Sequence, residues 1–174
     1  MPDVTEAIAS NLIITRVLDA PRSLVWKVHS QAEHLARWWG PASMTWMNGT
    51  LDFRPGGRFH YCMRGEDGTV LWGKFEYREI EEPSRISWVN CFSDPDGNTV
   101  RCPFMDDFPM QVLNAVTFRE DGARTILRLQ SAPHDATDAE WAAFKSIHAS
   151  MQEGFGATFA QLGLYLGQLQ DDGR

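Results

Sequence analysis

The feature that most constrains this chain is one long amphipathic helix that follows a run of strands. From Asp138 to about Gln168, large side chains recur at steps of three and four residues, the spacing of a single helical face. Thr137, with Glu140 three residues later, predicts a capping box at the start of this helix. The stripe consists of Trp141, Phe144, His148, Met151, Phe155, Phe159, Leu162 and Leu166. This single helix must cover the apolar face of everything that precedes it.

Alternating apolar residues and turn signals predict one strand, two short helices and then six further strands before the long helix. In residues 58–64, for example, Phe59, Tyr61 and Met63 share one face of a strand. Sequential strands with segregated helices indicate an α+β fold with an antiparallel sheet of about six or seven strands. The predicted strands cover residues 11–18, 44–53, 58–64, 70–80, 86–92, 110–119 and 124–131, and the short helices lie at 21–28 and 31–38.

Length and charge narrow the class of protein. The 174 residues suit one domain, which we expect over residues 10–170 with flexible ends at 1–9 and 171–174. The net charge of −7 and the lack of a basic stripe argue against nucleic-acid binding.

The cysteines and the hydropathy of the chain indicate the cellular compartment of the protein. The odd set of Cys62, Cys91 and Cys102 has no paired spacing, so free thiols in a reducing compartment are expected. Residues 1–10 do not resemble a signal peptide, and no stretch matches a transmembrane helix. A cytoplasmic protein without membrane insertion is predicted.

One helix is roughly 10 to 12 Å wide with its side chains, so a curved sheet around it leaves space at the sides. Large inward-facing rings and methionines then favour an apolar ligand cavity, although each ring has the alternative role of filling the core. The predicted ligand-binding residues are Trp39, Phe59, Tyr61, Met63, Trp88, Asn90, Phe92, Met110, Asn114, His148, Met151 and Phe155.

Catalytic signals are weak. His148, in the middle of the helical stripe, and Tyr61 are candidate acid/base groups, with a satisfied core histidine as the alternative reading of His148. No zinc-type spacing, phosphate loop or nucleophile elbow occurs, so no metal and no cofactor are predicted.

The long connection at residues 93–109, rich in proline and aspartate, is expected to be a lid or a mobile segment.

Several segments together resemble a known superfamily. They are Asp19-Ala20-Pro21-Arg22, Glu33-His34-Leu35-Ala36-Arg37-Trp38-Trp39-Gly40-Pro41, Arg54-Pro55-Gly56-Gly57-Arg58-Phe59, Gly73-Lys74-Phe75, Tyr77-Arg78-Glu79-Ile80 and Val116-Thr117-Phe118. The chain is identified by them as similar to the SRPBCC (START-like) superfamily, in the branch resembling the C-terminal domain of the activator of the ninety-kilodalton heat-shock chaperone ATPase.

This resemblance implies a helix-grip fold around a deep pocket, and relatives that bind lipids, steroids, polyketides or other hydrophobic compounds. Binding of a small hydrophobic molecule is therefore the main functional hypothesis. A cyclase- or hydratase-like enzyme using the same cavity and a co-chaperone-like interaction module are the alternatives. A homodimer is also plausible if Trp46 and Trp72 face outward.

Overall fold

The computed structural model describes residues 11–173 and contains the predicted order of elements. The expected flexible end at residues 1–9 lies outside the described residues. The elements are β1 (Leu12–Leu18), α2 (Arg22–Ser30), α3 (Ala32–Trp38), β2 (Met44–Leu51), β3 (Arg58–Gly65), β4 (Val70–Glu81), β5 (Arg85–Ser93), β6 (Val112–Asp121), β7 (Arg124–Pro133), α4 (Asp138–Ser146) and α5 (His148–Asp172).

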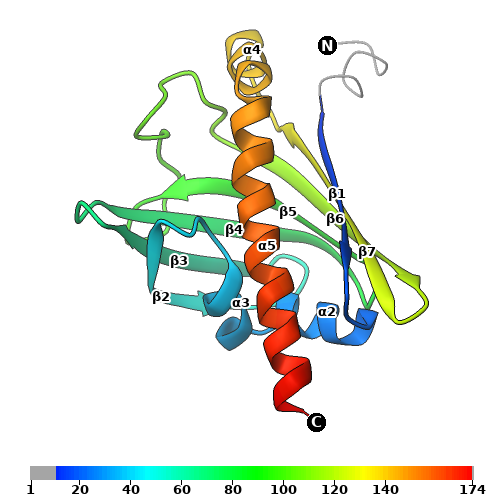
Figure 1. The fold of residues 1–174 in the computed structure, drawn as a ribbon. Helices are drawn as coiled ribbons and strands as arrows, with labels where there is room; N and C mark the ends of the chain where they lie inside the picture. The colour runs from blue at the N-terminus through cyan, green and yellow to red at the C-terminus, as the bar shows by residue number, and fades with distance from the viewer. Residues whose placement is uncertain (1–10, 174) are drawn as a thin grey trace.

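All seven strands form one antiparallel sheet in the order β1-β7-β6-β5-β4-β3-β2. Strands β2 to β7 follow one another as a meander, and β1 joins the far edge beside β7. The sheet curves around α5, which crosses its concave side (Figure 1). The α+β helix-grip prediction is therefore confirmed.

Alternation along the strands places the core on the concave side of the sheet. In β7, Leu127, Leu129 and Ser131 are buried while the residues between them are more exposed. Leu162 and Leu166 of α5 are also fully buried and belong to the same core cluster. The C-terminal half of α5 therefore closes the main core, as the helical stripe predicted.

The prediction of one continuous C-terminal helix was wrong, because the helix breaks at Ile147. This residue has φ −111° and ψ 13°, and its N–H donates to the carbonyl of Phe144 at 3.3 Å, three residues back rather than four. The Ser146 hydroxyl also bonds the carbonyl of Ala143 at 2.7 Å, which helps to end α4. Helix α5 restarts at His148 and runs to Asp172, past the expected end near Gln168.

The predicted capping box at the start of α4 is confirmed. The Thr137 hydroxyl accepts a hydrogen bond from the Glu140 N–H at 3.2 Å, and the Glu140 carboxylate accepts one from the Thr137 N–H at 2.9 Å. Two backbone donors that a helix start leaves unpaired are thereby satisfied.

A histidine on α2 is part of the apolar core. His29 lies between the rings of Trp38 and Phe118, with centroid distances of 4.7 and 4.8 Å. Burial lowers the pKa of His29 from 6.5 to about 4, although its Nδ1 lies 2.7 Å from the Val25 carbonyl, a contact that opposes the shift. The native side chain therefore stays neutral well into the acidic range.

We expect acid to destabilise the fold through His29. Between about pH 6.5 and 4 the unfolded chain binds a proton here and the native chain does not, so stability falls as the pH falls. The loss at pH 4 should be about 3 kcal/mol. Urea unfolding of His29→Leu should show a smaller loss across this range than the wild type, with His134→Leu, a half-buried histidine, as control. Equal pH dependence in wild type and His29→Leu would contradict this role.

Candidate ligand-binding cavity

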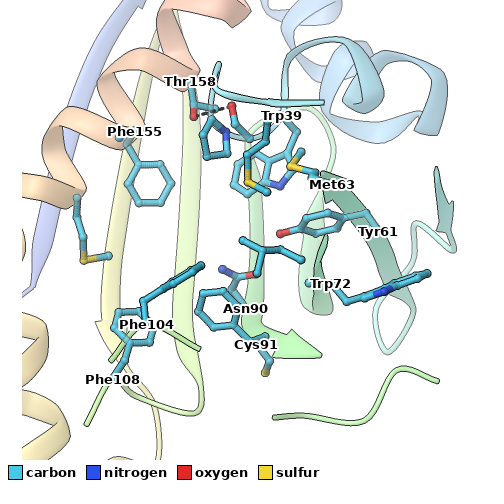
Figure 2. A pocket seen from close by; sticks show the side chains of 18 of the residues that line it. Trp39, Tyr61, Met63, Trp72, Asn90, Cys91, Phe104, Phe108, Phe155 and Thr158 are labelled. Atoms are coloured by element: carbon cyan, nitrogen blue, oxygen red, sulfur yellow. Dashed lines mark hydrogen bonds between the residues drawn. The ribbon is translucent and has the colours of Figure 1, made fainter. Parts of the chain in front are cut away.

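A cavity of about 390 Å³ lies between the sheet and the N-terminal half of α5. Side chains from α5, the sheet and the segment between β5 and β6 surround one space (Figure 2). We call that segment, residues 94–111, the β5–β6 connector. The lining residues are Trp39, Gly40, Pro41, Met44, Tyr61, Met63, Leu71, Trp72, Gly73, Asn90, Cys91, Phe92, Phe104, Phe108, Pro109, Met151, Gly154, Phe155 and Thr158. None of these side chains carries a formal charge at neutral pH.

More than half of the residues predicted to bind a ligand lie around this cavity. They come from β3, β5, α5 and the end of α3, which converge although they are far apart in sequence. Those that line it are Trp39, Tyr61, Met63, Asn90, Phe92, Met151 and Phe155. Their contact with a ligand remains a prediction.

Four other predicted residues lie outside the cavity lining. Phe59 is fully buried and stacks on Tyr61 at 4.9 Å, while Trp88 stacks on Phe75 at 4.9 Å. Asn114 is buried and bonded to Ser131 and to the Val112 carbonyl, so its amide already has partners. Met110 is half-buried at the end of the connector. The first three are buried, whereas most of the predicted residues that line the cavity are only half-buried.

His148 also lies away from the cavity lining. It occupies the first position of α5, after the break at Ile147, and packs edge-on against Phe144 at 5.1 Å. Its Nε2 is buried and has no hydrogen-bond partner among the described residues. Of the two candidate acid/base groups, Tyr61 is therefore the one that lines the cavity.

Tyr61 is held by its neighbours on β4 and α3. A side chain at Gly73, its cross-strand partner, would place a Cβ 2.6 Å from the Tyr61 hydroxyl, so glycine is needed for the ring to lie across β4. Trp39 and Phe75 meet the same ring edge-on at 6.5 and 5.9 Å. Burial raises the pKa of Tyr61 to about 12, although a hydrogen bond from the Trp39 side chain opposes the shift. The phenol therefore keeps its proton at neutral pH.

The rim beside Trp39 is tied to α5 through one carbonyl group. The Gly40 oxygen accepts hydrogen bonds from Thr158 Oγ1 at 3.3 Å and from Gln161 Nε2 at 2.8 Å. Gly40 has φ +97°, and a Cβ there would lie 2.2 Å from the Met63 Cε atom. Its positive φ requires glycine, and the absence of a side chain leaves room for the end of Met63.

The β5–β6 connector supplies the remaining wall. Phe104 and Phe108 meet Phe92 edge-on, at centroid distances of 6.3 and 6.1 Å. Phe104 is 68% exposed although it lines the cavity, so it stands at the mouth. Arg101 ties the connector to α4 through an ion pair of 3.0 Å with Glu140, whose side chain is 8% exposed. The prediction named this segment but not its two phenylalanines, whose presence in a proline-rich loop was the available signal.

The three cysteines are free, as predicted. No three His, Cys, Asp or Glu side chains within residues 11–173 gather as a metal site. None of the helices in that range is both long and apolar enough to cross a membrane.

Trp46, expected to face outward, instead stacks over Phe59 and Tyr61 at 5.8 and 6.0 Å, whereas Trp72 is half-buried and stacks on His60.

A curved antiparallel sheet around a C-terminal helix, with an apolar cavity between them, defines a protein of the helix-grip class. The chain belongs to the family of Activator of Hsp90 ATPase homolog 1-like proteins, whose sequence profile matches residues 19–167. The resemblance inferred from the motifs is thus confirmed. No curated protein sequence matches the chain.

Solved structures of bacterial proteins share this fold. Protein Ms6760 from Mycobacterium smegmatis is 26% identical, with a TM-score of 0.73 and 91% of each chain covered. A protein from Arthrobacter aurescens is also 26% identical, with a TM-score of 0.76 over 96% of this chain and 90% of that one. Protein NE0264 from Nitrosomonas europaea, at 21% identity and a TM-score of 0.73, covers 92% of this chain and 96% of its own.

Gly73→Ala should disturb the cavity wall and lower stability. The new methyl group would overlap the Tyr61 hydroxyl and force the ring aside, at a cost of about 1–3 kcal/mol. The control is Gly163→Ala on α5, where a Cβ meets nothing within 4 Å and should stabilise the helix by about 1 kcal/mol. Urea unfolding measures both. A Gly73→Ala protein as stable as the wild type would show that Tyr61 has free room to move.

Proposed function

We propose that this chain binds a small hydrophobic molecule in the cavity between α5 and the sheet. The observation that carries the proposal is a space of about 390 Å³ with aromatic, methionine and leucine walls and no charged lining group. Ligand sites are commonly about 300–1,000 Å³ in volume and mostly apolar, with few polar groups. A filled core of the same residues would leave no such space.

Native mass spectrometry of protein purified from its own host tests the proposal directly. A stoichiometric apolar compound, recovered by denaturing extraction, would support binding and name its chemical class. An empty protein that also gains no thermal stability from a broad panel of hydrophobic ligands would contradict it, because a ligand bound only by the folded state must stabilise it.

A reaction in the same cavity, of the cyclase or hydratase kind, is the enzymatic alternative. Tyr61 lines the cavity and keeps its proton at neutral pH, which suits a proton donor rather than a base. If a substrate is found, Tyr61→Phe should abolish turnover while leaving binding largely intact. Unchanged turnover in that variant would remove Tyr61 from the mechanism.

Interaction with a chaperone is the second alternative, favoured by the family description, which names an activator of the Hsp90 ATPase. Fold alone does not transfer that activity. The discriminating measurement is chaperone ATPase turnover with and without this protein.

A cytoplasmic location belongs to the main proposal and is supported by the three free cysteines.

A side chain added at Gly154 should block binding. Gly154 lines the cavity from α5, and a Cβ there meets nothing within 4 Å, so Gly154→Phe should fold and project its ring into the free space. We expect the Kd to rise at least tenfold, which corresponds to a loss of about 1.4 kcal/mol of binding free energy. Fluorescence titration with neutral N-phenyl-1-naphthylamine measures it. Gly163→Phe, on the same helix but outside the cavity lining, is the matched control and should bind like the wild type.

Ligand exchange should be faster without the Arg101–Glu140 pair. Arg101 is exposed, so the ion pair is expected to stabilise the closed position of the connector by only about 1 kcal/mol. Loss of that free energy should raise the rate at which the connector opens by roughly fivefold. Stopped-flow fluorescence of Arg101→Ala should show both association and dissociation accelerated, with a smaller change in Kd. Arg85→Ala, which breaks an ion pair with Glu79 away from the cavity, is the control. Wild-type rates in Arg101→Ala would exclude the connector as a gate.

A further inference from the structure

The polar groups within the cavity carry information about the ligand's chemistry, and the inference drawn from them rests on the proposed binding function. Thr158 is already committed, because its hydroxyl donates to the Gly40 carbonyl. Burial raises the pKa of the Cys91 thiol, which therefore stays neutral and is a weak hydrogen-bonding group. The strong polar side chains left to meet a ligand from the sheet are Tyr61 and Asn90.

Tyr61 presents a hydrogen-bond donor. Its pKa, raised to about 12, keeps the phenol protonated at neutral pH. The hydroxyl proton of Tyr61 has no acceptor among the hydrogen bonds of the described residues, so it remains available to a ligand.

Asn90 presents a second donor. Its Oδ1 atom is buried and has no hydrogen-bond partner among residues 11–173. Because that oxygen is inaccessible whereas Nδ2 is not among the buried atoms without a partner, the NH₂ group is the part of the amide left for a ligand. Figure 2 shows the polar ends of Asn90 and Tyr61 facing the same space. Asn90 and Tyr61 flank β4, where their partners are Phe75 and Gly73, and Gly73 places no side chain between them.

The walls restrict the rest of the ligand. Phe104 and Phe108 stand edge-on to Phe92, and Phe155 faces the cavity from α5, so flat rings find edge-to-face partners on several sides. With no cation in the lining, a carboxylate or phosphate would lose its hydration without gaining a counter-charge. An anionic ligand is therefore disfavoured.

We infer that the cavity selects neutral, flat aromatic compounds that carry a carbonyl oxygen, which accepts hydrogen bonds from Tyr61 O–H and Asn90 Nδ2–H. The carbonyl is the only polar group such a ligand needs. Two donors directed at one acceptor distinguish a ketone from a hydrocarbon of the same shape, and the uncharged walls distinguish it from an acid.

A matched set of three-ring probes tests this inference. Fluorenone carries a carbonyl, fluorene replaces it by a methylene group, and fluorene-9-carboxylate adds a charge. Titration calorimetry gives the ratio of the fluorene Kd to the fluorenone Kd for the wild type, Tyr61→Phe and Asn90→Leu. One lost hydrogen bond should lower this ratio about fivefold in each variant. Fluorene affinity should stay within about twofold of the wild type, which also reports that each variant is folded.

The infrared carbonyl band of bound fluorenone gives an independent readout. It should lie at lower frequency in the wild type than in an apolar solvent, and move back in Tyr61→Phe. A ratio and a band that do not change in either variant would overturn the inference while leaving cavity binding intact. Fluorene-9-carboxylate that binds as tightly as fluorene would overturn the neutral-ligand part. If the wild type binds neither fluorene nor fluorenone, this inference fails, and the proposed function is then decided separately by native mass spectrometry and the broad ligand panel.

Discussion

The close packing of the C-terminal half of α5 is the constraint on which the rest of the structure depends. In that half, Phe159, Leu162 and Leu166 are buried, and α5 contacts β1 and α3. Hydrogen bonds from Thr158 and Gln161 to Gly40 fix the middle of the helix. The N-terminal half is held off the strongly curved sheet, and Met151 and Phe155 there line a cavity instead of a core. One anchored end and one raised end of the same helix thus account for both the stability and the open space.

Glycine positions shape this space as much as the large side chains do. Gly73 leaves room for Tyr61 to lie across β4, and Gly40 leaves room for Met63. Aromatic rings then hold one another edge-on around the opening. A wall built in this way is rigid where sheet residues form it and depends on loop packing where the connector forms it.

The strand order, the concave face and the helical stripe were predictable from the sequence, because side-chain periodicity reports which face of an element is buried. Periodicity does not report position along a strand. Phe59 and Tyr61 share a face of β3, yet Phe59 is fully buried in the core and Tyr61 lines the cavity. No repeating pattern marks the break at Ile147, which local hydrogen bonds accompany, or the contacts of Phe104 and Phe108 with Phe92.

Glu140 has a role at two places in the fold. Its carboxylate completes the capping box of α4 and also pairs with Arg101 of the connector. Release of the connector takes Arg101 away from the Glu140 carboxylate, which also caps the first turn of α4. Opening of the connector and fraying of α4 are therefore coupled, and each makes the other easier. Faster amide hydrogen exchange in the first turn of α4 is then the expected signature of a released connector.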